Sequence, residues 1–281
     1  MSLDSAVHLA TPRLTRDVGL ALGGAAIAII GALCGIGGGL FAVPLLHYVF
    51  KLPLRRSVAT SLALVMTTGI AATAAEALHP GDALRWPVIG ALVLGALFGA
   101  QAGFAVGKRL PDVVLKALFV VALGAAGARL WLAAPGAIAP LSGAGALALG
   151  EALAVVALGF CAGVVAPILG ISGGLVAVPG LLLLMPELGA LGARAASLAM
   201  TVPNAARSLH LYAREGAVEP RPALAFAAGA LVGGAIGVQL VHLDGAARVG
   251  QLMLGGILLT TAARFAVDVL RRLRAALRRR P

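Results

Sequence analysis

The sequence is poor in charged residues and in aromatic side chains. Charged residues make up 12% of its 281 positions, about half the usual share in soluble proteins, and aromatic residues make up 4%. Hydrophobic residues instead reach 60%, and the mean hydropathy is +1.00. A soluble domain of this size needs far less apolar sequence, so the composition excludes that class of protein.

Cysteine is also scarce. The two cysteines, Cys34 and Cys161, both lie within apolar stretches. Neither has a neighbour at the spacing of a metal-binding motif, and neither stands in a polar loop where a disulfide partner would be expected. The sequence therefore predicts no structural disulfide, no metal site and no cofactor.

Apolar runs of about 20 residues, in contrast, follow one another along the chain. A helix of ~20 apolar residues crosses a hydrocarbon core of ~30 Å. Lipid offers the backbone no hydrogen-bond partner, which favours helices, and the alternating pattern of barrel strands is absent. We therefore predict an all-α, polytopic membrane protein.

The net charge of +11 comes from basic residues between the apolar runs and in one tail, from Arg271 to Arg280. These residues form no single binding face, so we predict no nucleic-acid partner. Basic loops beside membrane spans mark the cytoplasmic side and attract anionic lipid. The positive charge therefore points to membrane lipid as the partner.

The two halves of the chain repeat one another. Gly35–Pro44 matches Gly170–Pro179, and Ser61-Leu62-Ala63 matches Ser197-Leu198-Ala199 at a nearly constant offset. Self-similarity at a fixed separation indicates a duplicated structural unit. The predicted units are a cytoplasmic N-terminal segment (1–16), a first repeat (17–133), a linker (134–150), a second repeat (151–269) and a basic cytoplasmic tail (270–281).

Each repeat holds one glycine-broken segment and three uninterrupted spans. The broken segments, about 17–50 and 151–187, are too long for one crossing, and a continuous helix through their glycine clusters would be costly. We predict that each is a hairpin, either re-entrant or made of two short crossings. The long spans are predicted at 55–78, 86–108 and 111–133, and at 192–214, 220–242 and 246–269.

The distribution of lysine and arginine predicts the orientation of the spans. With the basic tail in the cytoplasm, the loops near Lys51, Lys108 and Arg214 also fall inside, whereas the linker and the Glu187–Arg194 loop fall outside. We interpret the N-terminal apolar stretch as retained and not as a cleaved signal peptide. The hairpins then enter from opposite sides, which predicts two inverted-topology repeats, an architecture of many secondary transporters.

The glycine clusters at the two breaks are the first candidates for a binding site. A helix that restarts after a break presents free N–H groups and its positive dipole end, and glycine lets a ligand approach closely. Two such ends meeting at one point would bind a small anion. The alternative is that the glycines only permit tight turns or close packing. The candidates are Gly37, Gly38, Gly39, Ser172, Gly173 and Gly174.

The span after the second hairpin carries a row of polar residues at steps of three and four, hence on one helical face. Hydroxyl and amide donors suit the oxygens of an anion, and interhelical hydrogen bonding is the alternative. An arginine in this row would add charge, unless it snorkels to the cytoplasmic surface. The row is Ser197, Thr201, Asn204 and Arg207 or Ser208, with Ser61 and Thr68 among its counterparts in the first repeat.

Glycines also recur at steps of four residues in two matching spans. We name Gly95, Gly99 and Gly103 the first glycine row, and Gly229, Gly233 and Gly237 the second glycine row. Rows of small residues allow helices to pack closely in membranes. This packing is predicted either within the chain or across a homodimer.

Two other functions fit parts of the sequence. Gly170-Ile171-Ser172-Gly173 has the form of an intramembrane serine protease motif, but Gly37 replaces the serine in the duplicated segment, and a serine nucleophile needs a base within reach. A passive anion channel is the second alternative. Glu76 and Glu151 are predicted near the outer ends of spans, so proton coupling has no obvious carboxylate relay and is left open. We predict that the protein is not an enzyme.

The paired glycine motifs, the Ser-Leu-Ala of each following span and the two glycine rows resemble the sulfite exporter TauE/SafE family of bacterial permeases. The resemblance extends from about residue 19 to residue 269. It implies a secondary transporter in the bacterial inner (cytoplasmic) membrane, with a small sulfur-containing anion such as sulfite, thiosulfate or an organosulfonate as substrate. Members differ in substrate and direction, so the resemblance fixes neither.

Overall fold

The computed structural model describes residues 13–78, 84–111 and 147–241, single positions between 113 and 128, and parts of 256–271. The elements formed by these residues are helices, with no strand among them. Five helices are long and apolar enough to cross a membrane, which confirms the prediction of an all-α, polytopic membrane protein. They are Asp17–Cys34, Leu54–Ala77, Trp86–Gly107, Leu149–Leu169 and Pro220–Leu240.

The two halves place corresponding helices in the same order. The first half comprises α2 (Arg13–Cys34), α3 (Gly39–Pro44), the π-helical η1 (Leu45–Val49), α4 (Leu54–Ala77) and α5 (Trp86–Gly107). The second comprises α7 (Leu149–Leu169), α8 (Gly174–Leu184), the 3-10 helix η2 (Pro186–Leu188), α9 (Gly189–Arg214) and α10 (Pro220–Val241). Four predicted spans correspond to α4, α5, α9 and α10. The predicted spans 111–133 and 246–269, the linker and both terminal segments lie mostly outside the described residues.

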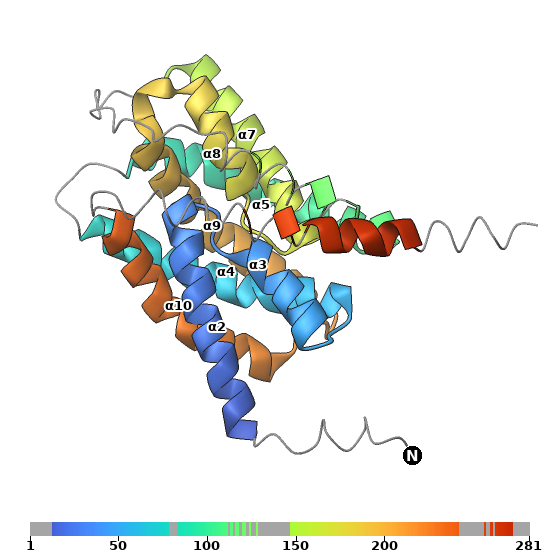
Figure 1. The fold of residues 1–281 in the computed structure, drawn as a ribbon. Helices are drawn as coiled ribbons and strands as arrows, with labels where there is room; N and C mark the ends of the chain where they lie inside the picture. Colours follow the sequence, from blue (N-terminus) through green and yellow to red (C-terminus); the bar gives the residue numbers. More distant parts are fainter. Residues whose placement is uncertain are drawn as a thin grey trace, which may run out of the picture.

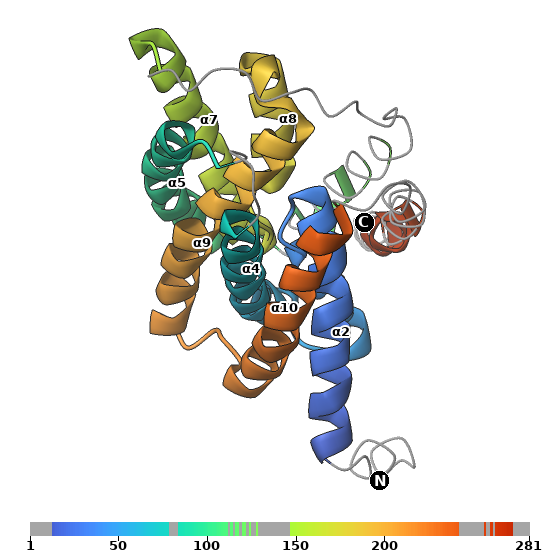
Figure 2. The same ribbon diagram turned by 90° about the vertical axis from the view of Figure 1, so that its left-hand side faces the viewer.

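Each glycine-broken segment forms a hairpin with a long first arm and a short second arm. The first arms, α2 and α7, have 22 and 21 residues. The second arms are the apolar helices Gly39–Val49 and Gly174–Leu184. At 1.5 Å per residue, a helix of the length of α8 spans about 16 Å, roughly half of a hydrocarbon core. The two hairpins approach each other from opposite ends of the molecule (Figures 1 and 2).

The first arm of each hairpin ends at a glycine in the left-handed conformation. Gly35 has a φ of 70° and Gly170 a φ of 65°, and the first turn continues through Gly37 and Gly38 with φ of 66° and 80°. Residues with a side chain rarely adopt these angles, so both turns favour glycine strongly. Tight turning is therefore one role of the glycine clusters.

Each hairpin packs against a helix from the other half of the chain. α5 lies along α7 and α10 lies along α2, while α4 and α9 contact each other between these two pairs (Figure 2). We call this arrangement cross-packing. The long helices of one half therefore hold the hairpin of the other half in place.

The two glycine rows make the cross-packing possible. A Cβ atom on any glycine of the first glycine row, which lies in α5, would overlap the backbone of α7. The second glycine row, which lies in α10, meets α2 in the same way. Helices approach this closely only where side chains are small. The rows therefore pack within the chain, which decides between the two predicted alternatives. The carbonyl oxygens that would be struck belong to Val156, Phe160 and Val164 on α7, and to Ala21, Ala25 and Ile29 on α2.

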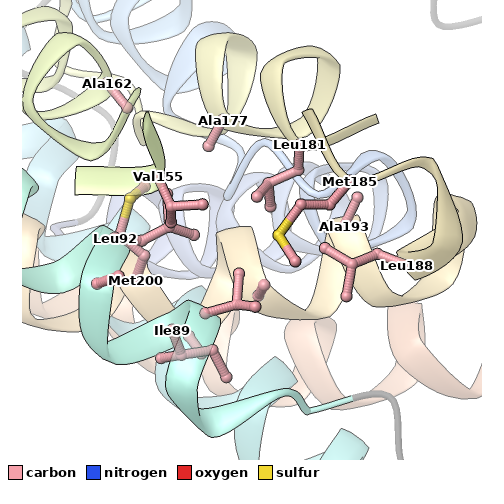
Figure 3. Packing of buried hydrophobic residues seen from close by; sticks show 14 of the residues in the cluster. Ile89, Leu92, Val155, Ala162, Ala177, Leu181, Met185, Leu188, Ala193 and Met200 are labelled. Carbon is pink, nitrogen blue, oxygen red and sulfur yellow. The ribbon is translucent and has the colours of Figure 1, made fainter. Parts of the chain in front are cut away.

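An apolar cluster fixes the short arm of the second hairpin (Figure 3). Leu92 of α5, Val155 of α7, Leu181 of α8 and Met200 of α9 are all fully buried in this cluster. Between helices in a membrane, such contacts stabilise through close packing and not through the exclusion of water. The position of α8 is thus set mainly by α7 and α9, and Leu92 of α5 completes the cluster.

α9 differs from the other long helices because it carries more polar side chains. Its residues 192–201 are all buried, and Arg194 is among them. The prediction of a loop from Glu187 to Arg194 was therefore wrong from Gly189 onwards, where α9 begins. The charge of Arg194 suggested a loop, but the buried carboxylate of Glu76 compensates that charge inside the protein.

Three loops that were predicted to be cytoplasmic meet at one end of the molecule. Arg56, at the start of α4, pairs with Glu219, just before α10, with 2.5 Å between Nη1 and Oε1. Lys108, after α5, lies 3.4 Å from Glu215, and Arg55 donates to the carbonyl oxygen of Lys108. The loops therefore share one end, as their basic residues predicted. The assignment of that end to the cytoplasm stays a prediction.

Candidate functional site

The tips of the two hairpins are in direct contact. A Cβ atom on Gly39, at the start of α3, would overlap the carbonyl oxygen of Gly170 in the second tip. In the same way, a Cβ atom on Gly174, at the start of α8, would overlap the carbonyl oxygen of Gly35 in the first tip. Each short arm thus begins against the turn of the opposite hairpin, and glycine is needed at both starting positions.

Ser172 lies between the two tips. Its hydroxyl donates to the carbonyl oxygen of Ile36 at 2.5 Å and accepts the N–H of Gly174 at 3.2 Å. Its counterpart Gly37 faces it, since a Cβ atom on Gly37 would lie 3.1 Å from the Cβ atom of Ser172. There is room for one side chain at this point, which explains why the two motifs differ here.

Two further serines join the tips to the following helices. Ser61 of α4 donates to the carbonyl oxygen of Gly170 at 2.7 Å and shares its hydrogen with that of Val58 at 2.8 Å. Ser197 of α9 donates to the carbonyl oxygen of Gly35 at 3.0 Å. Both serines are fully buried. Each half therefore stabilises the hairpin tip of the other half, through equivalent residues.

Replacing Ser197 by alanine is expected to lower the free energy of unfolding by about 0.6 to 2 kcal/mol, because the buried carbonyl of Gly35 loses its donor. The midpoint of thermal unfolding in detergent measures this change. Ser57→Ala is the matched control, because the Ser57 hydroxyl donates, within the described part of the chain, only to carbonyls of its own segment. An equal loss of stability in both variants would contradict the role of Ser197 at the tip.

Two of the predicted backbone donors are occupied within the tips. The N–H of Gly37 donates to the carbonyl oxygen of Gly31 at 3.1 Å, and the N–H of Gly174 donates to Ser172. Each of these bonds lies within one hairpin. An anion would therefore have to compete with hydrogen bonds inside each tip, and donation by Gly38, Gly39 and Gly173 stays a prediction.

The polar row of α9 faces the interior. Thr201 donates to the carbonyl oxygen of Ser197 at 2.8 Å, one turn before it in the same helix. Asn204 is buried, and both polar atoms of its side chain lack a hydrogen-bond partner among the described residues. The hydroxyl of Thr68, its counterpart on α4, is in the same situation. Buried polar groups are normally paired, so these two positions have unused capacity for hydrogen bonds.

Comparison with known proteins identifies the family. A model of the family described as "Sulfite exporter TauE/SafE" matches residues 4–130 and 155–281, which together make up most of the chain. The chain belongs to the TauE/SafE family. It is therefore a membrane transporter by family, with several helices that can span a membrane.

One curated relative of this TauE/SafE protein is a "Probable membrane transporter protein MamO" of Magnetospirillum gryphiswaldense. The two are 30% identical over 120 residues, which cover 41% of this chain and 18% of the relative. The match thus includes less than a fifth of the relative's length. No solved structure matches the chain.

Arg207 is half-buried in this TauE/SafE protein and reaches a neighbouring long helix. Its Nη2 atom donates to the side-chain oxygen of Gln101 on α5, at an exposed position. The predicted role of Arg207 as the charge of an anion site stays a prediction.

A buried ion pair joins Arg194 and Glu76 in this TauE/SafE protein, and it was not predicted from the sequence. Nη2 of Arg194 donates to Oε2 of Glu76 at 2.6 Å, and Nη1 donates to the carbonyl oxygen of Ala32 at 3.2 Å. Glu76 is the second-last residue of α4, and 118 positions separate it from Arg194. Comparison of the two repeats could have revealed the pair, because the positions equivalent to Glu76 and Arg194 hold the uncharged residues Tyr212 and Val58.

Proposed function

We propose that this protein is a secondary transporter that moves a small sulfur-containing anion, such as sulfite, thiosulfate or an organosulfonate, across the bacterial inner membrane. The observation that carries the proposal is the contact between two hairpin tips that are lined with buried hydroxyl groups. Membership of the TauE/SafE family supports transport as the activity and a small anion as the substrate class.

The hydroxyl groups at the tips donate to carbonyl oxygens of the opposite hairpin. Those of Ser61, Ser172 and Ser197 all act in this way. An oxyanion offers the same kind of acceptor with a full charge, and charge-assisted hydrogen bonds are roughly twice as strong as neutral ones. The substrate would thus replace the bonds that hold the tips together. Binding would separate the tips and open a path, which links recognition to movement.

We propose that the two halves are inverted repeats in the membrane, with units as predicted from the sequence. The hairpins then enter from opposite sides, and the loops that meet near Arg56 and Glu219 face the cytoplasm. Alternating access in many such transporters arises when one repeat moves against the other around a central site. A coupling proton and a homodimer are compatible with this arrangement.

Uptake of radiolabelled sulfite or thiosulfate into proteoliposomes tests the proposal. We expect saturable uptake that Gly38→Val reduces strongly, because Gly38 has a φ of 80° and a side chain there would meet Ile27. Flux that rises linearly with anion concentration would instead indicate a passive channel. The absence of uptake and binding for all sulfur anions tested would refute the assignment of substrate class.

Ser172→Ala separates transport from proteolysis. A transporter is expected to keep uptake with a reduced affinity, because one hydroxyl donor among several is lost. A protease would lose all turnover of a peptide substrate, because the nucleophile is gone. The variant is assayed for uptake and for cleavage of membrane-embedded peptides in the same preparation, and cleavage by the wild type that the variant lacks would overturn the proposal.

A further inference from the structure

The Arg194–Glu76 pair is a strongly buried ionic contact in this transporter. The two side chains are 6% and 2% exposed, whereas those of the Arg56–Glu219 pair are 53% and 30% exposed. An ionisable group inside a membrane protein is costly and usually has a functional reason. Removal of one partner from a buried pair is especially unfavourable, because the other charge stays uncompensated. Because both side chains are buried, a role in surface solvation does not explain the presence of this pair.

The pair lies against the tip of the first hairpin. A Cβ atom on Gly35 would lie 2.8 Å from Cγ of Arg194, and Nη1 of the same arginine donates to Ala32 in the last turn of α2. Ser197, which donates to the carbonyl oxygen of Gly35, is one turn further along α9 on the same face. Arg194 thus adjoins the site where the substrate is proposed to bind.

The hydrogen-bonding capacity of Arg194 is only partly used. Its two terminal nitrogens donate to Glu76 and Ala32, but its buried Nε atom finds no hydrogen-bond partner among the described residues. A guanidinium group binds oxyanions through two parallel N–H donors, and Nε with one terminal nitrogen forms such a fork. One donor of the fork is therefore without a partner while the other contacts Glu76.

The second hairpin has no such charge at the equivalent place. At the offset that relates Ser61 to Ser197, the counterpart of Glu76 is Tyr212, and that of Arg194 is Val58. The hydroxyl of Tyr212 donates to the carbonyl oxygen of Pro167 in α7 at 2.7 Å. A neutral hydrogen bond thus holds the end of α7 where an ion pair holds the end of α2. Packing of a hairpin against the following helices therefore does not by itself require the charges of Arg194 and Glu76.

We propose that Arg194 supplies the positive charge of the anion site, and that Glu76 is an internal counter-anion that the substrate displaces. This inference rests on the proposed function. In the substrate-free protein the carboxylate of Glu76 compensates the guanidinium of Arg194. A bound oxyanion takes over that role through Nε and a terminal nitrogen, and Glu76 is released at the end of α4. Substrate arrival and release of Glu76 are then one event.

Glu76→Gln provides the main test, because it removes the counter-anion and keeps the size of the side chain. We expect its unfolding midpoint to fall in a buffer with gluconate as the only anion, and to recover when sulfite or thiosulfate is added. Its apparent affinity for these anions should exceed that of the wild type at least about tenfold, because no internal carboxylate competes. Thermal shift and isothermal titration measure both effects.

Glu219→Gln is the matched control, because it removes a carboxylate from the exposed Arg56–Glu219 pair. It should show neither a loss that anions restore nor a tighter affinity. The inference is overturned if Glu76→Gln behaves like this control, or if it is destabilised and no anion restores it. The double variant Glu76→Gln, Arg194→Gln carries neither charge of this pair, and it provides the test if the single variant does not fold. The double variant should fold and lose anion binding. Retention of wild-type affinity by this variant would also overturn the inference.

The same measurements separate this inference from the proposed function. If the wild type takes up thiosulfate and the double variant does so with unchanged affinity, the inference fails and the function stands. If sulfur anions have no effect but phosphate or nitrate restores Glu76→Gln, the anion site at Arg194 stands and the substrate class is wrong. If no anion affects the wild type or Glu76→Gln, both are wrong.

Discussion

Valine in place of Gly95 is expected to push α5 away from α7 and to lower the free energy of unfolding by about 3 kcal/mol or more. An extra methylene in a well-packed core costs about 1–3 kcal/mol. Here even the first added carbon would overlap the carbonyl oxygen of Val156, which belongs to a helix backbone and cannot rotate away. Equilibrium unfolding in mixed detergent micelles measures the loss.

Gly90→Val is the matched control for this experiment. Gly90 belongs to the same helix, but a Cβ atom there would meet nothing within 4 Å. It should leave the stability nearly unchanged. Gly229→Val, which acts on the second glycine row, should reproduce the loss seen for Gly95→Val, since a Cβ atom there would overlap the carbonyl oxygen of Ala21. Similar stability in the Gly90 and Gly95 variants would show that cross-packing does not stabilise the protein.

Valine in place of Gly39 is expected to reduce transport at least about tenfold, which corresponds to about 1.4 kcal/mol. The added side chain would occupy the contact between Gly39 and Gly170 and would also press on Val65 of α4. The tips could then no longer close on one another. Initial rates of uptake into proteoliposomes measure the effect, with equal amounts of protein reconstituted.

The control for Gly39→Val is again the exposed position Gly90, at which valine should preserve the transport rate. Alanine at position 39 gives a graded test, because its single carbon overlaps the Gly170 carbonyl but does not branch. Its rate should fall between those of the wild type and the valine variant. Full transport by Gly39→Val would mean that contact between the tips has no part in the transport cycle.

The helices were largely predictable because a membrane restricts the chain to few structures. Apolar runs of sufficient length fixed α4 and α5 to within one residue, and glycine clusters marked both hairpin tips. The offset between Ser61 and Ser197 also predicted two equivalent places for these serines. Their equivalent bonds to Gly170 and Gly35 follow from that duplication.

The environment of the polar residues could not be predicted in the same way. Arg194 and Arg207 lie on one helix, yet one is buried against Glu76 and the other reaches Gln101 at an exposed position. Local sequence does not distinguish these cases, because the partners come from helices far away along the chain. Glu76 was placed correctly near the end of a span, but its depth depends on how α4 contacts α9.

Cross-packing also imposes an order on biosynthesis. α2 emerges from the ribosome early, whereas α10, the helix along which it finally lies, emerges only after α4 through α9 have been made. Until α10 is made, the flank of α2 that α10 finally covers therefore stays exposed in the membrane. Neither half can mature as an autonomous folding unit. Separately expressed halves should accumulate only when both are produced in the same cell.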